Sequence, residues 1–144
     1  FLIQFFGDQM ASVMPYADFV FGNESEAAAY GEAKGYGSDL GTIALKLSAQ
    51  PKASGTRPRI VVFTQGSSAT IVAQGGVVTT YAVDPLPREA LVDTNGAGDA
   101  FVGGFLSQLV QNKPMSECVR AGHYAARIII QRSGCTFPKE CDFY

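Results

Sequence analysis

The chain has 144 residues, of which 47% are hydrophobic and 17% charged, and its formal net charge at pH 7 is -2. This length and mixture predict one soluble globular domain or a large part of one. Lys and Arg are spread along the chain without runs, so neither a nucleic-acid nor an anionic-membrane partner is expected. No apolar stretch approaches the roughly 18 residues of a membrane span, and signal-peptide features are absent from the opening residues. We therefore expect a cytoplasmic protein, with the nucleus as an alternative.

Two further features concern the cysteines and the start of the chain. Cys118, Cys135 and Cys141 are odd in number and lack paired spacing, which predicts reduced thiols rather than a disulfide framework or a metal site. The first residue, Phe1, lies in an apolar segment without an initiator Met. This start is what we expect of a chain cut from a longer one.

The N-terminal part alternates between helical and extended patterns. A helix-like opening is stopped by Pro15, and the apolar run ADFVFGN, 17–23, predicts a buried strand that ends in polar residues. Helix-forming residues then follow from 24 to 34, and Gly35 is the expected stop. A second helix is predicted to begin after Ser38 as the N-cap and to end before Pro51.

The middle of the chain reads as strands. RIVVFTQG, 59–66, is a continuous β-branched run of the kind found in a central parallel strand covered on both faces. Two further runs, 69–74 and 77–83, flank the pair Gly75 and Gly76, which suits the positive φ angles of a tight hairpin. An α/β fold is therefore predicted, with parallel strands, flanking helices and one antiparallel hairpin.

The C-terminal part is predicted to be helical. The segment 99–111 has an apolar face, and 114–132 forms another helix with Pro114 in its first turn. Gly134 is the expected end of the second helix, and an irregular tail follows it.

The stretch DTNGAGDAFVGGF, 93–105, carries the chemistry. A dinucleotide fingerprint fails because its third glycine position is Phe101, and a P-loop fails because no Lys follows Gly103. What remains is GAGD at a helix start, where Gly96, Ala97 and Gly98 expose backbone N–H groups to an anion.

Asp99 lies in the same turn, where a carboxylate has a role in phosphoryl transfer. It would accept the proton of the attacking hydroxyl while the N–H groups stabilise charge on the transferred group. On the residues alone, the alternative is that Asp93 or Asp99 is a helix cap. For Gly103 and Gly104, close helix packing is the favoured interpretation.

The same stretch resembles the signature of the ribokinase-like (PfkB) family of carbohydrate and nucleoside kinases. FGNESEA, FTQG, RAGHYAA and GCTFP follow the family's order, and together with Asn95 they resemble its adenosine-phosphorylating members in particular. The match runs over nearly the whole chain. The resemblance implies a ribokinase-like layered fold and transfer of the ATP γ-phosphoryl group to the 5′-hydroxyl of adenosine, giving AMP and ADP.

The resemblance also assigns roles to residues. It implies that Asp99 is the catalytic base beside the anion hole of Gly96, Ala97 and Gly98. Asn23 and Glu26 match an NxxE motif that organises Mg²⁺ through water near the phosphates. Taken alone, these two residues would more often be a helix cap and a solvated acid.

Nucleotide contacts follow from the same resemblance. Thr64, Gln65 and Gly66 match the family's nucleotide-contacting TxG, although a simple strand-to-hairpin turn explains them equally well. On sequence alone, the single histidine of the chain is more often a packed helix residue than a base. The residues implied for the ATP purine pocket are Asn95, His123, Ala126, Ile130 and Phe137.

The resemblance covers only the C-terminal portion of family members. Residues 1–144 would then be the ATP-binding and catalytic portion of an incomplete kinase domain, without the lid and the N-terminal part that hold most of the nucleoside site. We expect this chain alone to be inactive or nearly so, because positioning supplies much of the catalysis. The N-terminal portion is its expected partner. Phe1 and the apolar opening are expected to cover a sheet edge that this portion normally shields, and such an edge invites aggregation or an unnatural dimer.

Three other interpretations stay open. The parent could phosphorylate another sugar or nucleoside, the chain could bind nucleotide without catalysis, or it could use the fold only to associate. An intact GAGD favours the kinase, since a non-catalytic module has no evident need of Asp99. Arg127 and Arg132 are not expected to contact phosphate.

Overall fold

The computed structural model describes residues 7–53 and 55–143. The chain divides into two compact units, Phe1–Ala82 and Val83–Tyr144. The apolar opening at 1–6, which is expected to cover a sheet edge, lies outside the described residues.

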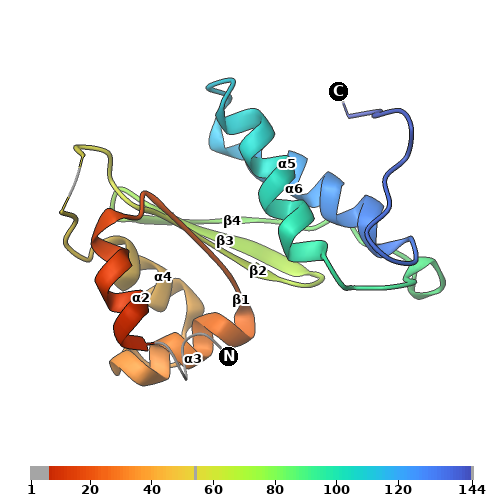
Figure 1. Cartoon of the computed structure of the whole chain (residues 1–144). Helices are drawn as coiled ribbons and strands as arrows, with labels where there is room; N and C mark the ends of the chain where they lie inside the picture. The colour runs from red at the N-terminus through yellow and green to blue at the C-terminus, as the bar shows by residue number, and fades with distance from the viewer. Residues whose placement is uncertain (1–6, 54, 144) are drawn as a thin grey trace. The chain divides into compact units, whose positions relative to one another are not determined.

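The first unit contains a four-stranded sheet in the order β1-β2-β3-β4 (Figure 1). β2 pairs parallel with β1 on one side and antiparallel with β3 on the other. The expected central strand is therefore confirmed, but its two neighbours run in opposite directions. The glycine-pair hairpin between β3 and β4 is also confirmed. The strands are β1 Phe19–Asn23, β2 Ile60–Gln65, β3 Ser68–Gln74 and β4 Val77–Tyr81.

Three helices lie beside one face of this sheet (Figure 1). The first ends in a short 3-10 turn, η1 Met14–Tyr16, which contains Pro15 as expected. The core between helices and sheet includes Ile43, Val61 and Phe63, all nearly inaccessible to solvent. The helices are α2 Gly7–Val13, α3 Glu24–Lys34 and α4 Leu40–Ser48.

The helix ends in this unit follow local chemistry, with one correction. α3 ends at Gly35, which adopts φ 65° in the left-handed region, as predicted. The N-cap of α4 is Asp39 rather than the expected Ser38. The reason is geometric, because the Asp39 carboxylate stands where it accepts the N–H of Thr42 at 2.7 Å.

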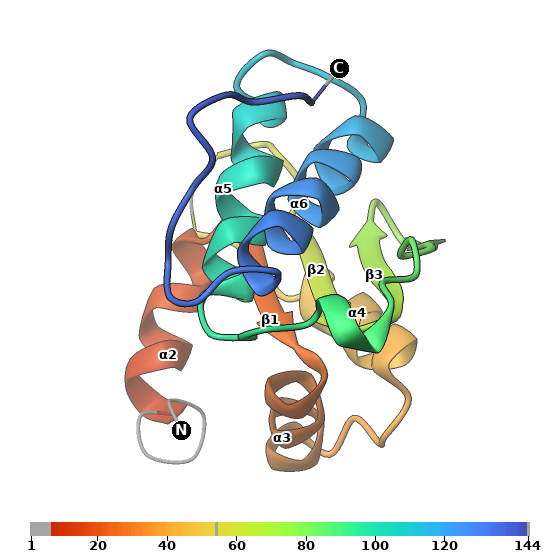
Figure 2. The same cartoon turned by 90° about the vertical axis from the view of Figure 1, so that its right-hand side faces the viewer.

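The second unit is built on two packed helices, α5 Ala97–Leu109 and α6 Met115–Ile130 (Figure 2). A Cβ atom at Gly104 would stand 2.3 Å from the carbonyl oxygen of Ala121, and one at Gly122 would stand 2.7 Å from the Phe101 ring. The two helices are therefore in contact at positions where no side chain fits. The packing interpretation holds for Gly104 but is wrong for Gly103, where a Cβ would meet nothing within 4 Å.

The end of α6 differs from the sequence prediction. The helix stops at Ile130 with Gln131 as its C-cap, whereas Gly134 was expected to end it. Gly134 has φ 69° and belongs to the irregular segment beyond the helix. A short 3-10 turn, η2 Arg88–Ala90, precedes the glycine-rich stretch. Within residues 7–53 and 55–143, no helix combines the length and apolar character needed to cross a bilayer.

Arg59, at the start of β2, is the principal buried polar side chain of the first unit. It is only 1% exposed, yet its guanidinium group makes five hydrogen bonds to main-chain carbonyls. These bonds join the turn after α2 to the end of α4 and the loop that follows it. The acceptors, at 2.6 to 3.3 Å, belong to Met14, Ala17, Leu47, Gln50 and Pro51.

We predict that Arg59→Met lowers the free energy of unfolding by about 3 kcal/mol, because it leaves several buried carbonyls without donors. Arg57→Met is the matched control, since Arg57 is exposed in the preceding loop, and it should cost less than about 0.5 kcal/mol. Urea unfolding of both variants measures the difference. Equal losses would contradict the role given to Arg59.

A second prediction concerns the α5–α6 contact. Gly104→Ala should lower the free energy of unfolding by about 1–3 kcal/mol, because the new methyl group overlaps main-chain atoms of α6. Gly103→Ala, one residue away, should instead stabilise α5 by about 0.5–1 kcal/mol, because Ala is the better helix former and the space is open. Thermal and urea unfolding compare the pair, and opposite signs are the expected result.

Candidate active site

The GAGD turn opens α5 in the arrangement of an anion site. Gly96 is the N-cap residue with φ 77°, and the first helical hydrogen bond runs from Ala100 N to Gly96 O at 2.9 Å. The N–H groups of Gly98 and Asp99 precede this bond, so they belong to the orphan donors of the helix start. A Cβ at Gly98 would meet nothing within 4 Å, which leaves room for an anion to approach.

Asp99 lies in the first turn of α5 and is exposed. The interpretation of Asp93 or Asp99 as a helix cap is wrong, because the cap position is Gly96 and no side chain caps it. Asp93 instead closes a local turn by accepting the N–H of Asn95 at 2.9 Å. Within the described part of the chain, the Asp99 carboxylate has no hydrogen-bonded partner, and its charge lies at the positive end of the α5 dipole.

The end of α6 anchors the chain just before this turn. The carbonyl of Ile130 accepts the N–H groups of Val92 at 2.8 Å and Asp93 at 3.2 Å. Arg127 on the same helix donates to the carbonyls of Asp84 and Pro85 at 3.2 and 3.1 Å. Arg127 thus binds the main chain that leads toward the turn through one of its guanidinium nitrogens.

His123 has the surroundings of a packed residue. Its ring centroid lies 5.6 Å from that of Phe101 on α5, and it is half-buried. Burial lowers the pKa of His123 below its usual 6.5, while Asp84 acts in the opposite direction. The imidazole is therefore neutral near pH 7, which suits contact with an apolar ring better than charge on a phosphate.

The remaining residues expected at the purine pocket differ in exposure. Ala126 and Ile130 lie half-buried on α6, while Asn95 is exposed beside the GAGD turn. Phe137 lies beyond α6 with 70% of its surface exposed, which is unusual for a ring of this size.

In the first unit, Asn23 and Glu26 form a capping box at the start of α3. The Asn23 side chain accepts the N–H of Glu26 at 2.9 Å, and Glu26 Oε2 accepts the N–H of Asn23 at 2.9 Å. Both side chains are exposed and fixed by this reciprocal pair. The cap interpretation from sequence is therefore confirmed, and a pocket of about 410 Å³ adjoins both residues.

Thr64, Gln65 and Gly66 lie at the end of β2. Thr64 stands opposite Asn23 in the parallel register, so the first unit brings the TxG and NxxE residues to the same sheet edge. Gln65 pairs with Ser68 and donates through Nε2 to the carbonyl of Ala69 at 2.5 Å, and Gly66 has φ 55°. The segment is thus also the strand-to-hairpin turn that the sequence allowed.

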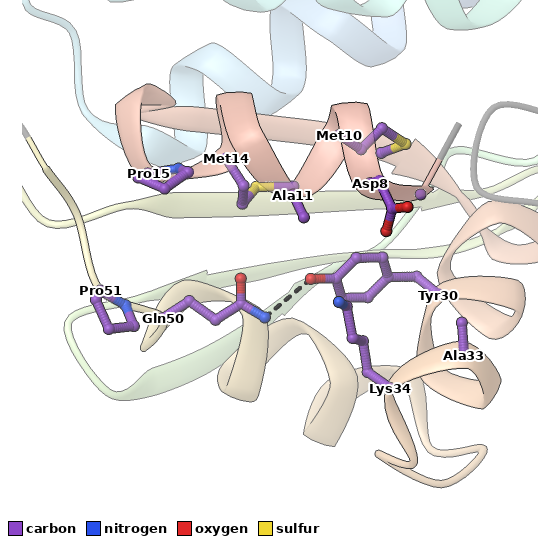
Figure 3. Close-up of a pocket in the computed structure, with 11 residues that line it drawn as sticks. Asp8, Met10, Ala11, Met14, Pro15, Tyr30, Ala33, Lys34, Gln50 and Pro51 are labelled. Carbon is purple, nitrogen blue, oxygen red and sulfur yellow. Dashed lines mark hydrogen bonds between the residues drawn. The ribbon is translucent and has the colours of Figure 1, made fainter. Parts of the chain in front are cut away.

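A second pocket, of about 390 Å³, opens between α2 and α3 (Figure 3). Gln50 donates its amide N–H to the Tyr30 hydroxyl at 2.8 Å, which fixes one wall. Met10, Met14 and Pro15 contribute apolar surface. None of the predicted site residues lines this pocket, and no sequence signal pointed to it because its walls come from separate segments.

Among residues 7–53 and 55–143, no group of three or more His, Cys, Asp or Glu side chains is arranged to bind a metal ion directly. The three cysteines are free thiols, with Cys118 buried and Cys135 and Cys141 exposed. Burial raises the pKa of the Cys118 thiol.

Comparison of the sequence with models of protein families identifies the family of this chain. Residues 2–141 match the model of the pfkB family carbohydrate kinase. The chain belongs to this family. The match covers both the NxxE segment and the GAGD turn.

Individual relatives agree with this result. The chain is 55% identical over 144 residues to Adenosine kinase 1 of Arabidopsis thaliana, covering 99% of this chain and 42% of that protein. Among solved structures, the adenosine kinase of Anopheles gambiae in complex with P1,P4-di(adenosine-5) tetraphosphate matches with a TM-score of 0.92 and 47% identity, over 98% of this chain and 42% of the other.

A third match is the adenosine kinase of Schistosoma mansoni in complex with 2-fluoroadenosine, with a TM-score of 0.90 and 34% identity. It covers 96% of this chain and 41% of that structure. The chain therefore spans less than half the length of the relatives that it matches. These likenesses bear out the α/β, ribokinase-like fold.

Proposed function

We propose that this chain is the C-terminal, ATP-binding and catalytic portion of an adenosine kinase. The reaction transfers the γ-phosphoryl group of ATP to the 5′-hydroxyl of adenosine and serves purine salvage. The observation that carries the proposal is the GAGD turn, where first-turn N–H donors and a carboxylate without a structural partner lie within four residues. The similarity to adenosine kinases supports the choice of acceptor.

Asp99 is the proposed catalytic base. Its carboxylate accepts the proton of the 5′-hydroxyl as the oxygen–phosphorus bond forms, and the bond between the γ-phosphorus and the β,γ-bridging oxygen breaks to release ADP. In a loose transition state the alcohol proton leaves late, so orientation of the nucleophile matters more than basic strength. The exposure of Asp99 is consistent with access to a substrate hydroxyl.

Gly96, Ala97 and Gly98 form the proposed anion hole. The first-turn N–H groups and the positive end of the helix dipole act on the oxygens of the transferred phosphoryl group. Glycine at 98 keeps the approach open, since no neighbouring atom lies within 4 Å of the position its Cβ would take. The donors are fixed before substrate arrives, because α5 packs on α6 and the preceding residues bind the end of α6.

Mg²⁺ is the proposed cofactor, held through water by Asn23 and Glu26. The donor set fits, since Mg²⁺ prefers oxygen ligands, uses few carboxylates and keeps several waters. Both side chains are exposed, and the capping box fixes them without using the second carboxylate oxygen of Glu26. Bound there, the ion would neutralise phosphate charge.

The remaining nucleotide contacts are proposals of the same kind. Thr64, Gln65 and Gly66 would contact the nucleotide at the end of β2, which is the edge where open α/β sheets bind ligands. Neutral His123, packed on Phe101, suits an aromatic surface near adenine. The other proposed purine contacts are Asn95, Ala126, Ile130 and Phe137.

The N-terminal portion that the longer relatives carry is the proposed partner of this chain. The acceptor pocket and the lid would come from it, so the isolated chain should bind nucleotide weakly and form little AMP. We place the reaction in the cytoplasm, where both substrates occur, with the nucleus as the alternative.

We predict that Asp99→Asn in the full-length protein lowers the rate of AMP formation by about 10²- to 10⁴-fold and leaves ATP affinity within about threefold, because the acid acts on the proton and not on binding. Glu89→Gln, which alters an exposed acid outside the turn, is the matched control and should keep full activity. The assay follows AMP formed from ATP and adenosine.

Three outcomes would contradict the proposal in whole or in part. ATP binding without AMP formation by the wild-type full-length protein would indicate a nucleotide-binding module. Full activity of Asp99→Asn would remove the role given to that residue. Phosphorylation of a different sugar or nucleoside in preference to adenosine would change the acceptor but keep the mechanism.

A further inference from the structure

The segment after α6, residues 131–143, turns back along the second unit toward the beginning of α6 (Figure 2). We name it the C-terminal strap. Its first part follows directly on Ile130, whose carbonyl holds Val92 and Asp93 before the GAGD turn. The strap therefore begins at the same point that anchors the proposed anion hole.

Cys135 of the strap lies against the backbone of Gly96. A Cβ on Gly96 would stand only 2.7 Å from the Cys135 sulfur and 3.9 Å from a methyl group of Ile129. Gly96 also has φ 77°, which L side chains rarely adopt. Glycine is thus favoured at 96 by its backbone conformation, and the Cys135 thiol occupies the side on which a Cβ would stand.

The far end of the strap is fastened to α6. The Arg120 guanidinium lies 4.1 Å from the centroid of the Phe143 ring, and the Tyr124 ring lies 5.3 Å from it. The Tyr124 hydroxyl donates to the Asp142 carboxylate and accepts the N–H of Asp142 at 3.3 Å. This latch of a cation over an aromatic face, an aromatic pair and two hydrogen bonds fixes the end of an otherwise irregular segment.

We propose that the strap positions the anion hole: the latch at Phe143 holds Cys135 against Gly96, and this contact keeps the N–H groups of the GAGD turn aimed at the ATP phosphates. Cys135 and Phe143 are positioning residues, since they act through the turn. This inference rests on the proposed function and gives a role to Cys135 and Phe143, to which the family resemblance assigned none.

The contact occupies a side of Gly96 that the helix pair leaves open. Gly96 has no side chain of its own to fill the space beside it, and Ile129 reaches only its edge. The Cys135 thiol fills that space from outside the α5–α6 pair. Without the thiol, Gly96 would have no side-chain contact on this side. The N–H groups in the first turn of α5 would then be held less rigidly in position.

The test measures ATP and adenosine affinities of the full-length protein by equilibrium titration. Cys135→Ala and Phe143→Ala should each weaken ATP binding about fivefold, because both release the turn, while adenosine affinity stays unchanged. ADP affinity should stay within about twofold, because the turn holds the γ-phosphate, whereas displacement of Phe137 in the same segment would weaken the binding of both nucleotides. Phe143→Tyr keeps an aromatic ring at this position and should bind ATP with the affinity of the wild-type protein. Cys141→Ala removes the other exposed strap thiol and should match wild type.

Thiol reactivity gives a second readout that does not depend on turnover. Iodoacetamide should alkylate Cys135 several-fold faster in Phe143→Ala than in wild type, and bound ATP should slow this reaction. Buried Cys118 reports unfolding and should stay unmodified in both proteins. Mass spectrometry of the digested protein measures the two rates separately.

The possible results distinguish a failure of the positioning role from a failure of the proposed kinase activity. Equal losses of ATP and adenosine affinity, or ATP affinity unchanged in both Ala variants, would overturn the positioning role. If Cys118 becomes reactive in Phe143→Ala, that variant is unfolded, and the ATP titration of Cys135→Ala alone tests the positioning role. A wild-type protein that binds ATP but forms no AMP would overturn the proposed kinase activity. The ATP affinities and the alkylation rates of Cys135 would still test the role of the strap, because neither depends on turnover.

Discussion

The close approach of α5 and α6 is the constraint on which the second unit depends. Gly104 and Gly122 leave no room for a Cβ, so the two helices touch through backbone and through the buried rings of Phe101 and Phe105. This contact fixes where α5 begins relative to the end of α6. The proposed anion hole is therefore held by helix packing and by the Ile130 carbonyl, rather than by a loop alone.

Two residues of the candidate site, Asn23 and Glu26, also stabilise a helix of the fold, whereas Asp99 makes no hydrogen bond to the rest of the described chain. Asn23 and Glu26 cap α3 and present oxygen atoms at the same place, so their structural role fixes the donors of the proposed Mg²⁺ site. Asp99 has no comparable partner among the described residues. A carboxylate at a helix start that makes no hydrogen bond within the described residues is available for the proposed proton transfer.

Much of the fold followed from local sequence patterns. The β-branched run of β2, the glycine pair of the hairpin and the stop at Gly35 were predictable because each depends on nearby residues. Two boundaries were wrong: Asp39 rather than Ser38 caps α4, because two adjacent polar residues could both serve as the cap, and α6 ends before Gly134.

Other features required the folded structure. Arg59 is only the polar first residue of the β-branched run in the sequence, and the convergence of separate segments in the structure places five carbonyls around it. Gly103 and Gly104 are equivalent in sequence, but only one faces the partner helix. The Cys135 contact with Gly96 was equally beyond local patterns. The roles of the site residues came from motif spacing, which identifies chemistry but not the contacts that support it.

The most direct test of the account is a crystal structure of the full-length protein with adenosine, Mg²⁺ and a non-hydrolysable ATP analogue. The account predicts γ-phosphate oxygens about 3 Å from the N–H groups of the GAGD turn, the Asp99 carboxylate facing the 5′-hydroxyl, and Asn23 and Glu26 around the hydrated ion. Phosphates bound away from α5, or Asp99 paired with another protein group and turned from adenosine, would contradict it.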